Sequence, residues 1–169
     1  MQKDSILNII LVGVGLCIVC GAVISTVAVS LRDQQEQNVI FDQQSKIIDA
    51  ARLLEVYPSS QEALASIEEV VVNLNDGQPS GIPPQQYDLD SILRDPSQHT
   101  VLNGSEDIAM ISVRENLSKV YIEYRNNELK TLILPVRGYG LWGTLYGYLA
   151  LDSDLNTIVG LEFYKHKET

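Results

Sequence analysis

Residues Ser5–Leu31 read SILNIILVGVGLCIVCGAVISTVAVSL, and none of these 27 residues carries a charge. A helix rises about 1.5 Å per residue, so about 20 apolar residues cross the ~30 Å hydrocarbon layer of a bilayer. This stretch therefore predicts one transmembrane helix. We assign residues 1–31 to a membrane anchor and expect the remainder of the chain to be soluble.

Two further features of this stretch have alternative explanations. Ala28–Ser30 has the small-x-small pattern of a signal-peptide cleavage site, but the apolar core of a signal peptide is only ~7 to 15 residues long. The length of the stretch thus favours a retained helix. Small residues also recur every fourth position, which fits either close packing against the helices of partner subunits or the ordinary composition of membrane helices. That row consists of Gly13, Cys17, Gly21 and Ser25.

The composition of the chain excludes several classes of function. A net charge of −10 argues against nucleic acid and anionic lipid as partners, because both bind basic surfaces. Both cysteines, Cys17 and Cys20, lie in the apolar stretch. The soluble part therefore has no disulfide, no thiolate metal site and no cysteine nucleophile. Lys3 on one side of the stretch and Arg32 on the other nearly balance, so charge leaves the membrane orientation open.

The first half of the soluble part predicts mainly helix. Apolar residues at helical spacing predict a juxtamembrane helix over Arg32–Leu54, within a segment that we assign to residues 32–56. Ser59–Glu62 has the S-x-x-E form of a capping box and predicts a short helix over Ser60–Glu69. A strand is expected at Val70–Leu74, followed by a turn.

The second half predicts an antiparallel sheet. Gly77–Asp107 is rich in Pro, Gly, Ser and Asp and is expected to be loop, within a variable region of residues 57–117. The run Leu132–Leu134 is typical of a strand buried on both faces. The overall fold class is α+β, with a β meander in residues 118–169. Its expected strands are Lys119–Arg125, Lys130–Val136, Thr144–Leu151 and Thr157–His166.

Gly138–Gly143 matches the G-x-G-x-x-G pattern of dinucleotide sites. That motif must open a helix whose N-terminus holds the pyrophosphate, whereas the residues after Gly143 alternate as in a strand. We therefore reject the nucleotide interpretation. Two explanations of the glycines stay open. The glycine backbone and the nearby aromatic residues form a surface for a flat ligand, or they form a strand bend with the aromatic side chains in the core. These aromatic residues are Tyr139, Trp142, Tyr146 and Tyr148.

Two other patterns are expected to be structural. Asp152–Asn156 resembles the start of a calcium loop, but Thr157 and Phe163 replace the glycine and glutamate that such a loop needs, which predicts a hairpin turn. Glu162 and His166 are expected on one face of a solvated strand end. The sequence contains no visible catalytic triad or metal cluster.

Four blocks of the sequence resemble a known family, two around the end of the apolar stretch and two in the C-terminal part of the chain. Residues 25–38 read STVAVSLRDQQEQN and residues 42–47 read DQQSKI; residues 134–142 read LPVRGYGLW, and residues 166–169 read HKET. These blocks are similar to the C subunit of the sodium-translocating NADH:quinone oxidoreductase. In that family HKET resembles the start of an E-T-P-G-L-G segment.

The resemblance implies a flavoprotein subunit of a six-subunit respiratory translocase. Such a subunit spans the inner membrane once, with a cytoplasmic N-terminus and an external, periplasmic FMN-binding domain. It relays single electrons through FMN between NADH and ubiquinone, coupled to Na⁺ export. The cofactor-binding residues that the resemblance implies are Gly138, Gly140, Trp142, Gly143, Glu168 and Thr169.

The sequence departs from the family pattern at its C-terminal end. The family carries FMN on the threonine of a Ser-Gly-Ala-Thr motif, and residues 1–169 contain no such motif. We therefore expect a C-terminally incomplete domain without isolated activity, in which one sheet face needs further residues to cover it. The G subunit of the related Rnf electron-transport complex and a cofactor-free membrane-anchored scaffold or sensor domain remain alternatives.

Overall fold

The computed structural model describes residues 6–167 and divides the chain into two compact units. The first unit ends at Phe41 and the second begins at Asp42. Helix α1 (Ile6–Ala50) contains the predicted membrane stretch and continues into the second unit as one helix. Its window of highest mean hydropathy reaches 2.6, and none of that window is buried in protein. The helix is therefore a candidate membrane span, as the sequence predicts.

The segments that follow α1 agree with the sequence in type but differ in their limits. The helix ends at Ala50 rather than at Leu54, because Arg52 adopts a left-handed backbone (φ 51°) before the 3-10 turn η1 (Leu53–Glu55). Helix α2 (Ser60–Ala65) has the predicted cap, in which the Glu62 amide donates to Ser59 Oγ at 3.3 Å.

Helix α2 is shorter than predicted because strand β1 (Ile67–Asn73) begins where we expected its last turn. Three consecutive valines, Val70–Val72, favour the extended backbone, and the strand starts three residues before them. The prediction of featureless loop over Gly77–Asp107 is also wrong. That segment contains η2 (Pro84–Gln86), helix α3 (Leu89–Arg94) and β2 (His99–Val101).

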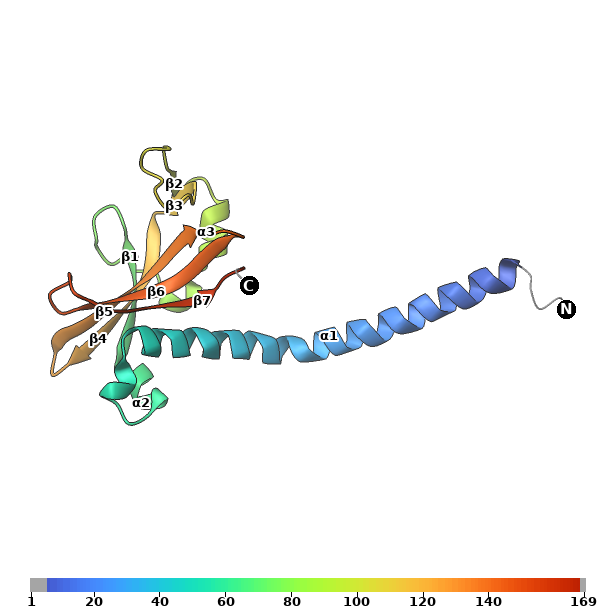
Figure 1. Ribbon diagram of the computed structural model, residues 1–169, viewed down its shortest axis with the longest axis horizontal. Coiled ribbons are helices and arrows are strands. Elements are labelled where there is room, and N and C mark those ends of the chain that lie inside the picture. Colours follow the sequence, from blue (N-terminus) through green and yellow to red (C-terminus); the bar gives the residue numbers. More distant parts are fainter. Residues whose placement is uncertain (1–5, 168–169) are drawn as a thin grey trace. The chain divides into compact units, whose positions relative to one another are not determined.

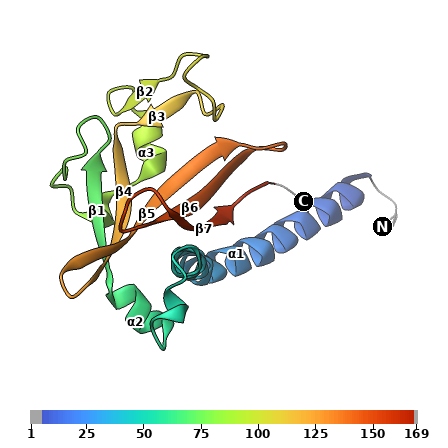
Figure 2. The same ribbon diagram turned by 60° about the vertical axis from the view of Figure 1, so that its left-hand side comes forward.

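A five-stranded antiparallel sheet forms the centre of the second unit, in the order β1-β4-β5-β6-β7 (Figure 1). The predicted meander is confirmed, and β1 adds one strand beside β4. A separate hairpin of β2 and β3 (Val113–Glu115) lies near α3 (Figure 2). The meander strands are β4 (Leu117–Arg125), β5 (Glu128–Tyr139), β6 (Thr144–Asp152) and β7 (Ile158–Lys165).

The last residues of α1 pack on one face of this sheet, which we call the covered face. Ile47, Ile48 and Ala50 form the core cluster there with side chains that include Ile133 and Ala150 of β5 and β6. The helix backbone approaches β7 closely, since a Cβ added to Gly160 would lie 2.4 Å from the carbonyl oxygen of Ala50. Glycine is required at this position because any side chain would collide with backbone.

The opposite face of the sheet, which we call the open face, carries apolar residues with partial exposure. Ile133 is fully buried on the covered face, whereas its neighbours Leu132 and Leu134 on the open face are half-buried. Leu161 and Phe163 of β7 are exposed by 47% and 42%. The run Leu132–Leu134 is therefore buried fully on one side only. Coverage of this face by further residues stays a prediction.

Candidate functional site

The glycine-rich block forms the tip of the hairpin between β5 and β6. The two strands pair up to Tyr139 opposite Thr144, and the Gly140 amide then donates to the Gly143 carbonyl at 2.8 Å. This tight closure leaves Leu141 and Trp142 at the tip, where their side chains are 79% and 65% exposed. The interpretation that placed Trp142 in the core is therefore wrong.

Two other segments contact this tip. The Tyr139 amide donates to the Ala109 carbonyl at 2.8 Å, and a Cβ on Gly138 would lie 3.7 Å from the same oxygen. A Cβ on Gly143 would lie 2.8 Å from Cδ of Lys167, so the lysine methylenes lie against the glycine backbone. The structure thus gathers Gly138, Gly140, Trp142 and Gly143 in one place, with Lys167 beside them. The two remaining predicted residues, Glu168 and Thr169, lie outside the described residues.

The predicted strand context of the G-x-G-x-x-G match is confirmed. Antiparallel strands flank the glycines on both sides, and no helix begins in Gly138–Gly143. The Asp152–Asn156 segment is the predicted turn, closed by a 2.8 Å hydrogen bond from the Leu155 amide to the Asp152 carbonyl. Within residues 6–167, no cluster of three or more His, Cys, Asp or Glu side chains has metal-binding geometry.

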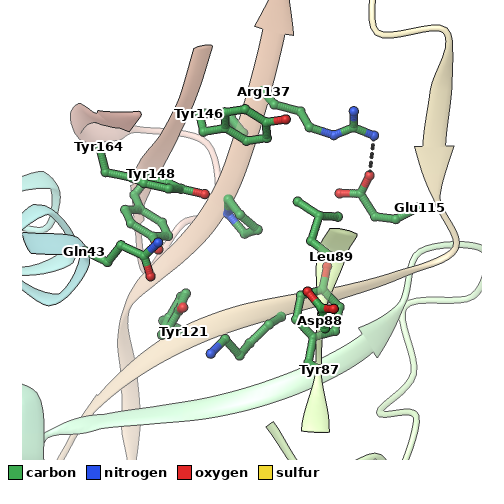
Figure 3. A pocket seen from close by; sticks show the side chains of 13 residues that line it. Gln43, Tyr87, Asp88, Leu89, Glu115, Tyr121, Arg137, Tyr146, Tyr148 and Tyr164 are labelled. Atoms are coloured by element: carbon green, nitrogen blue, oxygen red, sulfur yellow. Dashed lines mark hydrogen bonds and ion pairs between the residues drawn. The ribbon is translucent and has the colours of Figure 1, made fainter. Parts of the chain in front are cut away.

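A second feature is a cavity of about 240 Å³ on the covered face, which we call the tyrosine cavity (Figure 3). Tyr148 stacks on Tyr164 with ring centroids 4.8 Å apart, and its ring edge meets Tyr121 at 5.6 Å. Tyr121 and Tyr148 are buried, while Asp88 at the rim is exposed. The tyrosines that line the cavity are Tyr87, Tyr121, Tyr146, Tyr148 and Tyr164.

One wall of the tyrosine cavity holds a buried ion pair. Nη2 of Arg137 donates to Glu115 at 2.7 Å and to the Val113 carbonyl at 2.6 Å, and both charged side chains are about nine-tenths buried. Arg137 Nε is buried and has no hydrogen-bond partner within the described part of the chain. Lys119 lies over the Tyr121 ring at 5.4 Å. The cavity therefore combines aromatic faces with a buried, paired arginine.

The buried tyrosines remain protonated at neutral pH. Burial, reinforced by the Glu115 carboxylate, raises the pKa of Tyr87 to about 12. Burial also raises the pKa of Tyr121, Tyr148 and Tyr164. The phenol is the favoured form because a low-dielectric site disfavours the charged phenolate. These hydroxyls can therefore donate hydrogen bonds.

Sequence reasoning found two of these tyrosines, Tyr146 and Tyr148, but missed the cavity. Strand alternation was the available signal, since the register puts Tyr121, Pro135 and Tyr148 on one face. Tyr87 comes from the segment that we predicted to be loop. The packing of η2 against β1 and of α3 against β3 brings that segment to the cavity.

Comparison with known proteins gives a consistent result. The chain is 41% identical over 173 residues to the C subunit of the Na(+)-translocating NADH-quinone reductase of Pseudomonas aeruginosa. It is 37% identical over 169 residues to the same protein of Vibrio vulnificus, and 36% identical over 174 residues to that of Vibrio campbellii. These alignments cover 99% of this chain and 66% to 67% of the relatives. The chain belongs to this C-subunit family.

A solved structure agrees with the assignment to the C-subunit family. The crystal structure of Shewanella oneidensis NqrC aligns with a TM-score of 0.66 and 28% identity, over 75% of this chain and 59% of that one. No protein-family model matches the sequence. The chain spans about 66% of the length of the first of these relatives.

Proposed function

We propose that this chain is the flavin-carrying, electron-relaying subunit of a respiratory NADH:ubiquinone reductase that exports Na⁺. The observation that carries the proposal is family membership, at 41% identity over 99% of the chain. The proposed partners are the other subunits of a six-subunit membrane complex, which uses NADH and ubiquinone. In this proposal, α1 holds the domain at the inner membrane, with the N-terminus cytoplasmic and the domain external.

The hairpin tip has features that fit an FMN ring. Trp142 offers a flat apolar surface that is 65% exposed, beside Leu141 at 79%. Gly143 is buried beneath the flexible methylenes of Lys167, which must move aside for a ligand to reach its backbone. Such a site allows close approach by a planar group. A bound flavin supplies reversible electron transfer at its ring.

Each residue of the tip has a distinct task in this proposal. The Trp142 indole and the Leu141 side chain cover one face of the ring and exclude water from it. Because Gly138, Gly140 and Gly143 have no side chain, the flavin ring can contact the backbone of the tip directly. The Lys167 ammonium offsets phosphate charge, with Glu168 and Thr169 next to it in the chain. Covalent attachment requires a Ser-Gly-Ala-Thr threonine, which residues 1–169 do not contain.

The test is to express the natural coding sequence, including any codons that follow Thr169, together with a flavin transferase and the other subunits. We expect in-gel flavin fluorescence from this subunit. Trp142→Ala should shift the flavin absorption spectrum or its reduction by NADH. Tyr124→Ala, an exposed aromatic on the open face, is the matched control and should change neither. A non-fluorescent subunit in an assembled complex would support a cofactor-free scaffold instead.

A further inference from the structure

The tyrosine cavity is separate from the hairpin tip that we propose for the flavin. Its floor is Tyr121 and Tyr148, and its walls come from α3, β3 and β7. Figure 3 shows Tyr146, Tyr148 and Tyr164 on one side of the space and Leu89 with Asp88 on another. The volume, about 240 Å³, lies below the ~300 Å³ at which sites for whole drug-sized molecules begin. A single ring system is therefore the largest suitable occupant.

The charges around the tyrosine cavity select against ionic ligands. Arg137 is paired with Glu115 at 2.7 Å, and Lys119 is paired with Glu69 at 3.3 Å. Asp88 adds a carboxylate at the exposed rim, where hydrogen bonding from Ser91 lowers its pKa. The walls are thus nearly neutral and the entrance is acidic, which disfavours phosphate and carboxylate groups.

The polar groups of the cavity favour a ligand that accepts hydrogen bonds. Arg137 Nη2 is committed to Glu115 and to the Val113 carbonyl, and the Tyr87 hydroxyl donates to the Leu117 carbonyl at 3.2 Å. The hydroxyls of Tyr146 and Tyr164 on the cavity wall are donors for a ligand oxygen. The stacked pair Tyr148–Tyr164 supplies aromatic faces at the same place.

We propose that the tyrosine cavity binds, without covalent attachment, a neutral planar ring that accepts hydrogen bonds through carbonyl oxygens. A quinone head group and an isoalloxazine ring share this chemistry. The ring contacts the aromatic side chains of Tyr146 and Tyr164, and its carbonyl oxygens accept hydrogen bonds from tyrosine hydroxyls of the cavity wall. The site goes beyond the proposed hairpin flavin because none of its lining residues belongs to the tip Gly138–Gly143.

The experiment measures binding to the full chain in nanodiscs by saturation-transfer NMR and calorimetry. One probe is a fully substituted dimethoxy-dimethyl benzoquinone, which cannot add to Cys17 or Cys20. The other probe is riboflavin, which lacks the phosphate. Binding of the quinone alone identifies a quinone head group as the ligand, binding of riboflavin alone identifies the flavin ring, and binding of both supports the shared chemistry.

Variants locate the bound probe. Tyr164→Leu, which removes the stacked ring, and Leu89→Trp, which fills the cavity, should each weaken binding by about tenfold or more. Tyr124→Leu on the open face is the control and should stay within about twofold of the natural chain. Circular dichroism checks that each variant is folded. If Tyr164→Leu does not fold, the affinity measured with Leu89→Trp tests the proposal.

Failure of both probes to bind, or unchanged affinity in folded Leu89→Trp, would overturn the proposal. Neither result affects the flavin proposal, which is read from covalent flavin fluorescence. Loss of that fluorescence with retained probe binding would reject the hairpin flavin and leave the tyrosine cavity intact.

Discussion

Gly160→Ala tests how the end of α1 is held against the sheet. Gly160 pairs with Ala150 in the β6–β7 ladder, directly beneath the helix end. A Cβ at this position would lie 2.4 Å from the carbonyl oxygen of Ala50, 3.3 Å from its carbonyl carbon and 3.6 Å from its Cα. All three contacts are to backbone, so no side-chain rotation relieves them. The helix end or the strand must move.

The cost of that movement follows from what the contact holds together. Ala50 and Ala150 are fully buried, and Ile47 and Ile48 in the same cluster are at most 4% exposed. A shift of α1 large enough for a methyl group loosens all of these contacts. Overpacking in a core costs about 1 to 3 kcal/mol. Because the contacts of the added Cβ are all to backbone, we expect a loss of about 3 kcal/mol, at the upper end of this range. In a domain of this size that lowers Tm by about 9 to 15 °C.

The assay is thermal unfolding of the full chain in detergent, followed by tyrosine near-ultraviolet circular dichroism. This signal reports the packed rings Tyr121, Tyr148 and Tyr164 rather than the membrane helix. Gly104→Ala is the matched control, because a Cβ added to this loop glycine would have nothing within 4 Å. The control should change stability by less than about 0.5 kcal/mol. If Gly160→Ala has the same Tm as Gly104→Ala, the close packing of α1 on β7 is wrong.

Three further predictions concern a buried network, the tyrosines and the hairpin tip. Glu123 is fully buried, accepts hydrogen bonds from Tyr57 at 2.9 Å and Thr131 at 2.8 Å, and forms an ion pair with Arg125 at 2.7 Å. Glu123→Gln should therefore lower the free energy of unfolding in urea by about 3 kcal/mol. The exposed Glu128→Gln should leave the urea midpoint nearly unchanged, and equal losses in the two variants would contradict a structural role for the network. In an absorbance titration, Tyr87 should ionise near pH 12. Because the folded protein favours the phenol over the phenolate, stability should fall as pH rises from the unfolded pKa of about 10 to the folded pKa of about 12. Ionisation of all eight tyrosines near pH 10 in the folded protein would refute this. Trp142→Ala should change stability by no more than about 0.5 kcal/mol in the thermal assay, since the indole is 65% exposed; a loss of about 3 kcal/mol would return Trp142 to a core role.

Local patterns in the sequence were sufficient where one physical effect dominates. The uncharged stretch Ser5–Leu31 has no stable alternative to a helix in a bilayer, and α1 covers it from Ile6 onwards. The Ser59 hydroxyl accepts from the Glu62 amide three residues on, so the cap could be predicted without the fold. The asparagines of the Asn126-Asn127 turn both have positive φ, 53° and 61°, as such a hairpin needs.

Predictions were weaker where two local preferences compete. Helix and strand both suit the residues after Ala65, and pairing of Ile67 with Glu123 across the sheet decided for strand β1. The sequence left Trp142 open between a core and a surface position, with the core favoured, since a glycine-rich strand bend occurs in both settings. The two-residue closure between Gly140 and Gly143 decided the matter by turning the indole outward.

By itself, the sequence determined the membrane helix, the antiparallel meander, the hairpin around Trp142 and the family, because each depends on residues that are close in the chain. Only the tertiary structure decided that Gly160 must be glycine and that Arg137 pairs with Glu115, 22 residues away. It alone brings Tyr87 of the connecting segment to Tyr121, Tyr148 and Tyr164 of three strands. The reason is physical: strand alternation tells which residues share a face, but not which helix or loop packs on that face to enclose a cavity.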